Sequence, residues 1–248
     1  MSKNRNKLRL HKKTIIAFCV LTLLTLNSIY PSQSQTKRIN SNQDFDSFQK
    51  WCENRENISA EAKRTVEAIV NSSDIYDSIP DISKSNCKEI GDALSKQKKL
   101  IILDYRDLED LRPLSTLINL EELSLYGEYN SRGGRKKSYK MDPFPISKLI
   151  NLKSLSMTSL NIENISSLKK LTKLESLSLP RNNISDISPL LPLKRLKDLS
   201  LQNNLIQDFR PLSRLVNLEE LRIWGNPAKH VESLKNLPKL RYLNGPIK

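Results

Sequence analysis

The chain has 248 residues, a formal net charge of +14, three cysteines and two histidines. Six positive charges lie in residues 1–13, which leaves +8 on the rest of the chain. No recognition helix, aromatic RNA-binding motif or zinc-ligand spacing accompanies that charge, so nucleic acid is not an expected partner. No glycine-rich phosphate loop or metal-ligand cluster indicates a cofactor or a metal site.

Residues 1–35 have the order of segments that is typical of a secretory signal peptide. A basic stretch precedes an apolar run over residues 14–30, and a short polar segment follows. Threonines and an asparagine interrupt the run, which disfavours a spanning helix of about 20 residues. Cys19 does not indicate a lipid anchor, because the bulky Phe18 precedes it. We predict an exported protein (secreted, periplasmic or at the cell surface), with an uncleaved membrane anchor as the alternative because no alanine-x-alanine cleavage site is present.

Residues 36–97 predict a small helical region. Asp44, Ser59 and Asn86 are N-capping residue types, and apolar side chains follow each of them at helical spacing. The first helix would carry Phe45, Phe48 and Trp51. Terminal repeats of stacked arrays need a cover for their exposed core, so we expect this region to be an N-terminal cap.

Cys52 and Cys87 are the two cysteines outside the signal segment. An even pair in an exported chain favours a disulfide, which would stabilise the fold by about 3 to 5 kcal/mol through the long loop it closes. Two buried free thiols are the alternative. Metal binding is not expected there, since no histidine lies nearby.

A 22-residue repeat dominates the rest of the chain. Each unit opens with leucine-x-x-leucine-x-leucine or a close variant, and self-similarity at this period indicates a stacked array. The opening leucines are Leu152, Leu174, Leu196, Leu218 and Leu240. The alternation at the start of each unit predicts one strand of about three residues. Asn182, Asn204 and Asn226 follow these strands, where a buried amide would bond backbone groups of neighbouring turns.

The units resemble leucine-rich repeats of the short 22-residue class found in bacterial internalins. Residues 182–190, Asn-Asn-Ile-Ser-Asp-Ile-Ser-Pro-Leu, carry that resemblance most closely. It implies an α/β solenoid over residues 98–248, right-handed, with parallel strands on its concave face. It also implies a non-catalytic module that binds a protein partner, although this scaffold serves many unrelated partners.

Two units depart from the period. Counting back from Leu120 puts Lys98 at the opening of a degenerate first unit, with Ile101 and Leu103 at its inward strand positions. The next unit is ten residues too long, which predicts an inserted loop at about residues 127–143. A basic cluster lies in this loop and would bind an anionic polymer or a membrane surface, unless it is simply solvated. Its residues are Arg132, Arg135, Lys136, Lys137 and Lys140.

The strand positions that point away from the core form the expected binding face. Tyr126, Arg222 and Trp224 are residue types that dominate protein interfaces, although Trp224 could instead pack on the last turn. Glu122, Asp198 and Glu220 would set a charge preference. The expected contact residues also include the serines of the central strand position, which are Ser124, Ser156, Ser178 and Ser200.

We do not predict an enzyme. A serine nucleophile needs a base within reach, and His230, the one histidine outside the signal segment, follows its strand and is expected on the opposite side. Glu122 and Glu220 lie four repeats apart, too far to flank one glycosidic bond at about 4.8 Å per strand.

Overall fold

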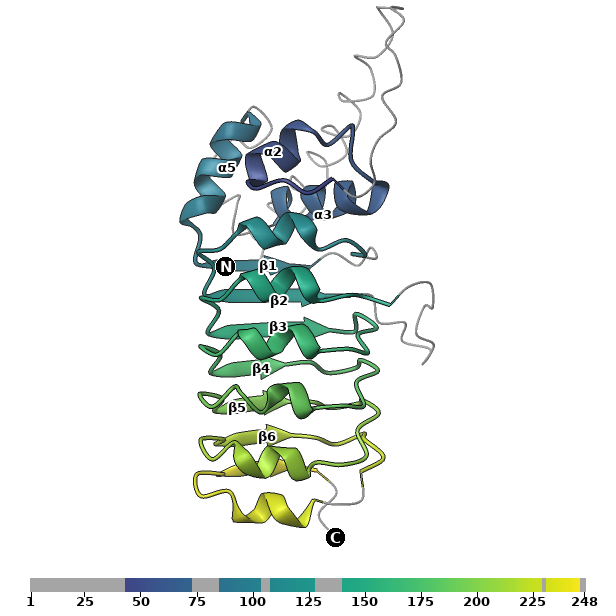
Figure 1. The fold of residues 1–248 in the computed structure, drawn as a ribbon, viewed down its shortest axis with the longest axis vertical. Coiled ribbons are helices and arrows are strands. Elements are labelled where there is room, and N and C mark those ends of the chain that lie inside the picture. Colours follow the sequence, from purple (N-terminus) through teal and green to yellow (C-terminus); the bar gives the residue numbers. More distant parts are fainter. Residues whose placement is uncertain (1–42, 73–84, 104–107, 128–139, 229–230, 246–248) are drawn as a thin grey trace, which may run out of the picture. The chain divides into compact units, whose positions relative to one another are not determined.

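The computed structural model of the chain describes residues 43–72, 85–103, 108–127, 140–228 and 231–245. The expected signal segment lies outside these residues. In the described part, seven short parallel strands form one open sheet whose order follows the chain (Figure 1). They are β1 (Lys99–Ile102), β2 (Glu122–Tyr126), β3 (Ser154–Thr158), β4 (Ser176–Ser178), β5 (Asp198–Ser200), β6 (Glu220–Arg222) and β7 (Tyr242–Asn244).

A short 3-10 helix follows each of the first six strands and leads back to the next one. These helices are η1 (Arg112–Thr116), η2 (Phe144–Lys148), η3 (Ser166–Lys170), η4 (Ser188–Leu190), η5 (Arg210–Arg214) and η6 (Glu232–Asn236). Before η1 to η5, an Asp or Asn two residues ahead of the helix accepts a hydrogen bond from its first N–H, as Asp186 does from Ser188 at 2.8 Å. Proline stands at the second position of η1, η2, η4 and η5, where its fixed φ favours the turn.

The strands stack in the register that the 22-residue period predicts. Leu155, Leu177, Leu199 and Leu221 are partners in successive strands, and all are buried in one continuous core. Because one short strand cannot bury its own apolar face, each unit depends on its neighbours for this core.

The asparagines after the strands form the predicted ladder. The buried side chain of Asn204 donates to the carbonyls of Leu179 (2.9 Å) and Leu201 (3.0 Å) and accepts from the Ile184 N–H (3.1 Å). Asn182 repeats this pattern one unit earlier. The amides therefore satisfy buried backbone groups that the irregular turns leave without partners.

The first strand corrects the predicted register of the first unit. Lys99 pairs with Glu122 and Ile102 with Leu125, so Leu100 and Ile102 face the core. The prediction that Ile101 and Leu103 point inward was wrong, and Leu103 is 61% exposed. A slip of one residue exchanges the two faces of a strand. The core position Leu108 follows Ile102 by six residues, whereas Ile184 follows Leu179 by five.

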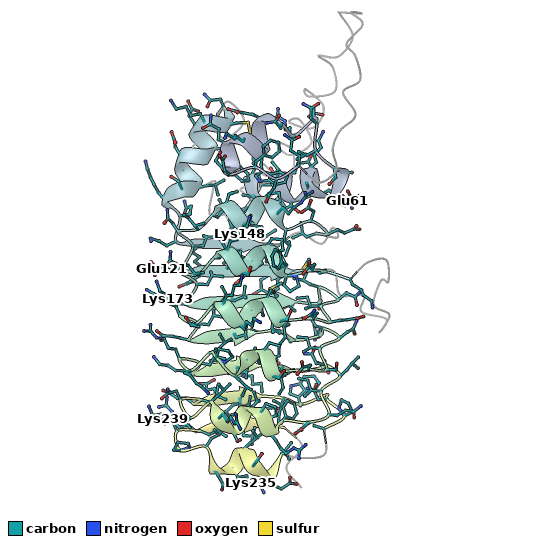
Figure 2. All side chains as sticks on the ribbon, in the orientation of Figure 1. Glu61, Glu121, Lys148, Lys173, Lys235 and Lys239 are labelled. Carbon is teal, nitrogen blue, oxygen red and sulfur yellow. A yellow bond between two sulfur atoms is a disulfide. The ribbon has the colours of Figure 1, made fainter. Side chains whose placement is uncertain are left out.

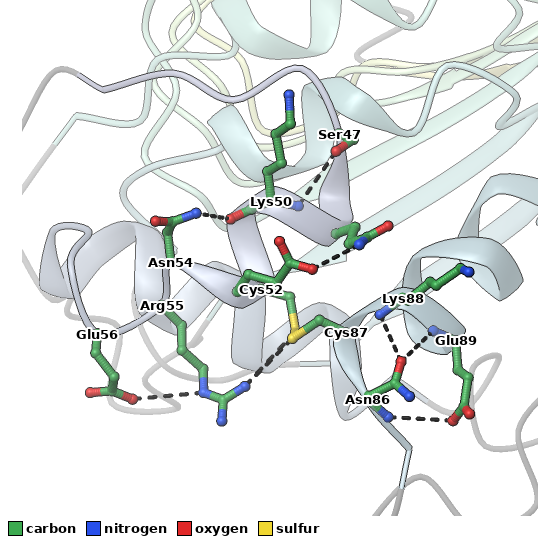
Figure 3. The surroundings of a disulfide bond; sticks show 12 residues. Ser47, Lys50, Cys52, Asn54, Arg55, Glu56, Asn86, Cys87, Lys88 and Glu89 are labelled. Atoms are coloured by element: carbon green, nitrogen blue, oxygen red, sulfur yellow. Dashed lines mark hydrogen bonds and ion pairs between the residues drawn. A yellow bond between two sulfur atoms is a disulfide. The ribbon is translucent and has the colours of Figure 1, made fainter.

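Within residues 43–72 and 85–98, three helices precede the sheet, which confirms the helical nature of this region. They are α2 (Phe48–Glu53), α3 (Ala60–Val70) and α5 (Cys87–Lys96). Ser59 caps α3 through the N–H of Ala62 at 3.1 Å, as predicted. Asn86 forms a capping box with Glu89 at the start of α5. A disulfide between Cys52 and Cys87 joins α2 to α5 (Figure 3).

The first helix begins later than predicted. Ser47, not Asp44, caps α2 by accepting from the N–H of Lys50, and Phe45 lies before the helix. Asp44 instead pairs with Lys148 of η2 at 3.3 Å. The buried Trp51 lies beneath the guanidinium of Arg112 at 5.5 Å, so the helices pack directly on the first repeat.

Candidate functional site

Three positions of each strand point away from the core and together form a surface that we call the outward face. The first position holds Lys99, Glu122, Ser154, Ser176, Asp198, Glu220 and Tyr242. The second holds Ile101, Ser124, Ser156, Ser178, Ser200, Arg222 and Asn244. The third, just beyond the shorter strands, includes Tyr126, Thr158, Pro180, Gln202 and Trp224. Large side chains therefore gather at the two ends of this face and small ones in its middle.

The middle of the outward face is lined by serines. Ser154 and Ser156 of β3 pair in register with Ser176 and Ser178 of β4, and all four are partly exposed. Ser200 differs, because it is only 7% exposed and its hydroxyl lies 3.2 Å from the side-chain oxygen of Gln202. The predicted contact at Ser200 is therefore largely covered. The short hydroxyl side chains leave the strand backbone close to the surface.

An arginine-centred cluster occupies the C-terminal end of the outward face. Asp198 and Glu220 are partners across β5 and β6, where two carboxylates repel each other. Arg222 donates to Asp198 at 2.7 Å and also to Glu220, so its single positive charge bridges both carboxylates and reduces their repulsion. Burial alone would lower the pKa of Arg222, but the attraction of Asp198 and Glu220 outweighs it and raises that pKa.

Two aromatic side chains flank this cluster. The Arg222 guanidinium lies 5.6 Å from the ring centre of Tyr242, in cation–π geometry. Tyr242 is 46% exposed and Trp224 is 43% exposed. Tyr242 was not among the predicted contact residues, although it stands 22 positions after Glu220 and could have been found from the period.

The N-terminal end of the outward face carries a smaller polar group. Lys99 and Glu122 form an ion pair of 3.2 Å across β1 and β2, and both side chains are about half exposed. Tyr126, at the end of β2, is partly exposed. The structure thus places Tyr126 and Trp224 on the same face but four strands apart, at opposite ends of the serine-lined middle.

A column of alternating charges runs beside the outward face, at the residue before each strand. We call this column the edge ladder, and its members are Lys98, Glu121, Lys153, Glu175, Lys197, Glu219 and Arg241. Glu121 pairs with Lys98 (3.2 Å) and Lys153, Glu175 with Lys197 (2.7 Å), and Glu219 with Arg241.

The pairing in the edge ladder shifts the pKa of its charged groups. Hydrogen bonds from Lys153 and Lys98 lower the pKa of Glu121. A hydrogen bond from Lys197 lowers the pKa of Glu175, and the pKa of Lys197 rises for the same reason. None of these groups is buried, so the ladder is a surface feature whose energy salt will screen.

Most of the predicted basic loop lies outside the described residues, namely Arg132, Arg135, Lys136 and Lys137. Lys140 is described, and it pairs with Glu163 at 2.8 Å. Over the described ranges, no group of three or more His, Cys, Asp or Glu side chains is placed to hold a metal ion. No helix in the described part of the chain is long and apolar enough to cross a bilayer.

Solved structures with a similar architecture include two bacterial internalins. The chain is similar to an internalin (inlF) from Listeria monocytogenes, with 34% identity, a TM-score of 0.52, and coverage of 62% of this chain and 42% of that one. It is also similar to internalin C2 of the same organism, with 24% identity, a TM-score of 0.53, and coverage of 73% and 85%. The fold is a leucine-rich repeat solenoid. It is internalin-like, and this chain spans less than half the length of the first of these two internalins. No protein-family model and no curated protein matches the sequence.

Proposed function

We propose that this leucine-rich repeat protein is an exported, non-catalytic module that binds a protein partner through the outward face. The observation that carries this proposal is the exposed pair Trp224 and Tyr242 beside Arg222. Tryptophan, tyrosine and arginine are the residues that most often dominate the binding energy of protein interfaces. The internalin-like fold supports an interaction module in general.

The layout of the outward face suggests how a partner would bind. Trp224 and Tyr242 would supply apolar anchors at one end and Tyr126 at the other. Between them, the short serine side chains would let a partner approach the sheet closely and bond the exposed hydroxyls. Since Arg222 neutralises only one of its two carboxylates, the C-terminal cluster retains a net negative charge and would favour a basic side chain of the partner.

Export belongs to the same proposal. Residues 1–35 would direct the chain out of the cytoplasm, either as a cleaved signal or as a membrane anchor. The disulfide between Cys52 and Cys87 supports an oxidising destination, because such bonds persist mainly outside the reducing cytosol.

Site-specific photocrosslinking tests the binding face before the partner is identified. A photoreactive amino acid replaces Tyr126, Ser178 or Trp224 on the outward face, and Ile118 or Ile150 in matched control variants away from the strands. The full-length chain is then irradiated with extracts that contain candidate partners. We expect one discrete adduct from the outward positions and none from the controls, and the double variant Trp224→Ala/Tyr242→Ala should lose it. Adducts from the control positions alone would refute the proposed face.

A further inference from the structure

Positive charge gathers on the side of the repeats that carries the 3-10 helices. Residues 164–174, 187–197 and 209–218 contain eight Lys and Arg residues and no Asp or Glu. Lys197 belongs to the edge ladder, and Arg210 pairs with Asp208 at 2.7 Å. The other six residues form a surface that we call the basic strip. They are Lys169, Lys170, Lys173, Lys194, Arg195 and Arg214.

The charges of the basic strip are not neutralised. None of its six residues forms an ion pair with any carboxylate of the described residues. Lys173 donates instead to the amide oxygen of Asn151 (2.7 Å), and Lys194 to the carbonyl of Arg214 (3.1 Å). These neutral acceptors orient the amines and do not compensate their charge, and Arg195 has only the attraction of the nearby Glu175 without an ion pair.

Two carboxylates close in sequence to the basic strip belong to the edge ladder and form their ion pairs there. Lys173 and Glu175 are only two residues apart, yet Glu175 hydrogen-bonds to Lys197 of its own column. The same is true of Glu219, which pairs with Arg241. Carboxylates are therefore available nearby but are held by the ladder, so the basic strip keeps a positive potential of its own.

The basic strip follows the direction in which the repeats stack. Lys173 and Arg195 are 22 residues apart in successive units, and Lys170 and Arg214 occupy equivalent places two units apart, with Pro192 at the place between them. Figure 2 shows Lys148 and Lys235 on the 3-10 helices, and Lys173 and Lys239 at the edge where the chain returns to the sheet. Lys235 and Lys239 lie three units after Lys169 and Lys173 in equivalent places, so they add two cations toward the C-terminal end. A linear array of this kind matches a linear ligand.

We propose that the basic strip binds a linear polymer of phosphate groups, independently of the outward face. Guanidinium and ammonium groups are the usual phosphate ligands in proteins. Within the three segments of the strip, Val216 is the one exposed large apolar side chain, so a polymer fits this surface better than insertion into a bilayer does. These segments also expose no aromatic ring on which a nucleic-acid base could stack.

Binding of the full-length chain to long-chain inorganic polyphosphate, measured at several salt concentrations, tests the proposal. The strip variant carries Lys169→Gln, Lys170→Gln, Arg195→Gln and Arg214→Gln. The control variant loses the same four charges from the helical cap. Its substitutions are Lys50→Gln, Arg64→Gln, Lys88→Gln and Lys96→Gln. We expect the strip variant to bind on the order of a hundredfold more weakly at low salt, with a log–log salt slope shallower by about 3, and the control to stay within about threefold.

Four outcomes would overturn the proposal. Equal losses in both variants would show that only net charge matters. Unchanged binding by the strip variant, with binding lost on neutralising the four cations of residues 132–137, would place the site in the inserted loop. Binding to vesicles of anionic phospholipid without binding to polyphosphate would assign the surface to a membrane. Tighter binding to single-stranded DNA than to polyphosphate would point to nucleic acid. Circular dichroism and thermal unfolding of each variant verify that the fold is intact.

Discussion

Replacing Asn204 with alanine should reveal how much the asparagine ladder stabilises the solenoid. The Asn204 side chain is 3% exposed and makes three hydrogen bonds of 2.9 to 3.1 Å, two to carbonyls and one from an N–H. Its removal leaves these backbone groups without partners in a site that water does not reach. At about 1 to 1.5 kcal/mol for each bond, we expect the free energy of unfolding to fall by about 3 to 4 kcal/mol.

Urea denaturation, followed by circular dichroism and extrapolated to zero denaturant, measures this loss. Asn217→Ala is a suitable control, because that side chain lies at the surface, donates one bond to the carbonyl of Lys194 and accepts one from the exposed Lys239. We expect the control to lose less than about 1 kcal/mol. If the free energy of unfolding of Asn204→Ala also fell by less than about 1 kcal/mol, the Asn204 side chain would not be an important hydrogen-bond partner of the turn backbone, and the reasoning would be refuted.

Three further predictions concern the disulfide, the first strand and the edge ladder. Replacing Cys52 and Cys87 with serine should cost about 4 kcal/mol, from the chain entropy of a bond that links residues 35 positions apart, and an unchanged urea midpoint would contradict this. Ile102→Ala should cost about 2 to 4 kcal/mol in urea unfolding, because Ile102 is buried, whereas Leu103→Ala should cost less than about 0.5 kcal/mol; the reverse order would restore the register expected from the period. The pKa of Glu175, measured by NMR titration, should lie below its usual range and rise in Lys197→Gln, because the hydrogen bond from Lys197 holds it down. Since the folded-state pKa is the lower one, this contribution to stability is present above the unfolded-state pKa and is lost as the pH falls through the folded value; an unchanged Glu175 pKa in the variant would contradict the pairing.

The fold could be predicted from the sequence because the same pattern of apolar residues recurs in each of several units. Leu177 and Leu199 occupy equal places in successive units, so the period alone places them side by side in the sheet. Asn182 and Asn204 were predicted to serve the turn backbone for the same reason, and they do. The cysteine pair could be predicted from the even count of cysteines outside the signal segment.

The wrong predictions concern parts of the chain that do not follow the 22-residue pattern of the other units. The first unit has one more residue between its strand and Leu108, so counting back from Leu120 gave the wrong face for Ile102 and Leu103. The start of α2 was misplaced because Asp44 and Ser47 are both good capping residues, and the tertiary contact of Asp44 with Lys148 cannot be seen in the local sequence.

For the candidate site, the sequence predicted which side chains point away from the core but not which of them contact one another. Alternation along the strands identified Arg222 and Trp224 as outward residues, but not the bridging of Asp198 and Glu220 by Arg222. That contact depends on side-chain reach across strands. The covering of Ser200 also depends on its larger neighbours, which the one-letter pattern does not describe.

The edge ladder has a consequence for how such an array can change in length. Its charges alternate in sign from Lys98 to Arg241, so each of the five inner members has an opposite charge on both sides. Loss of one 22-residue unit, for example the one that contains Glu175, would bring Lys153 next to Lys197. Loss of two adjacent units would restore the alternation. Like charges placed in neighbouring strands are destabilising, so this column of charges favours a change in length by two units over a change by one.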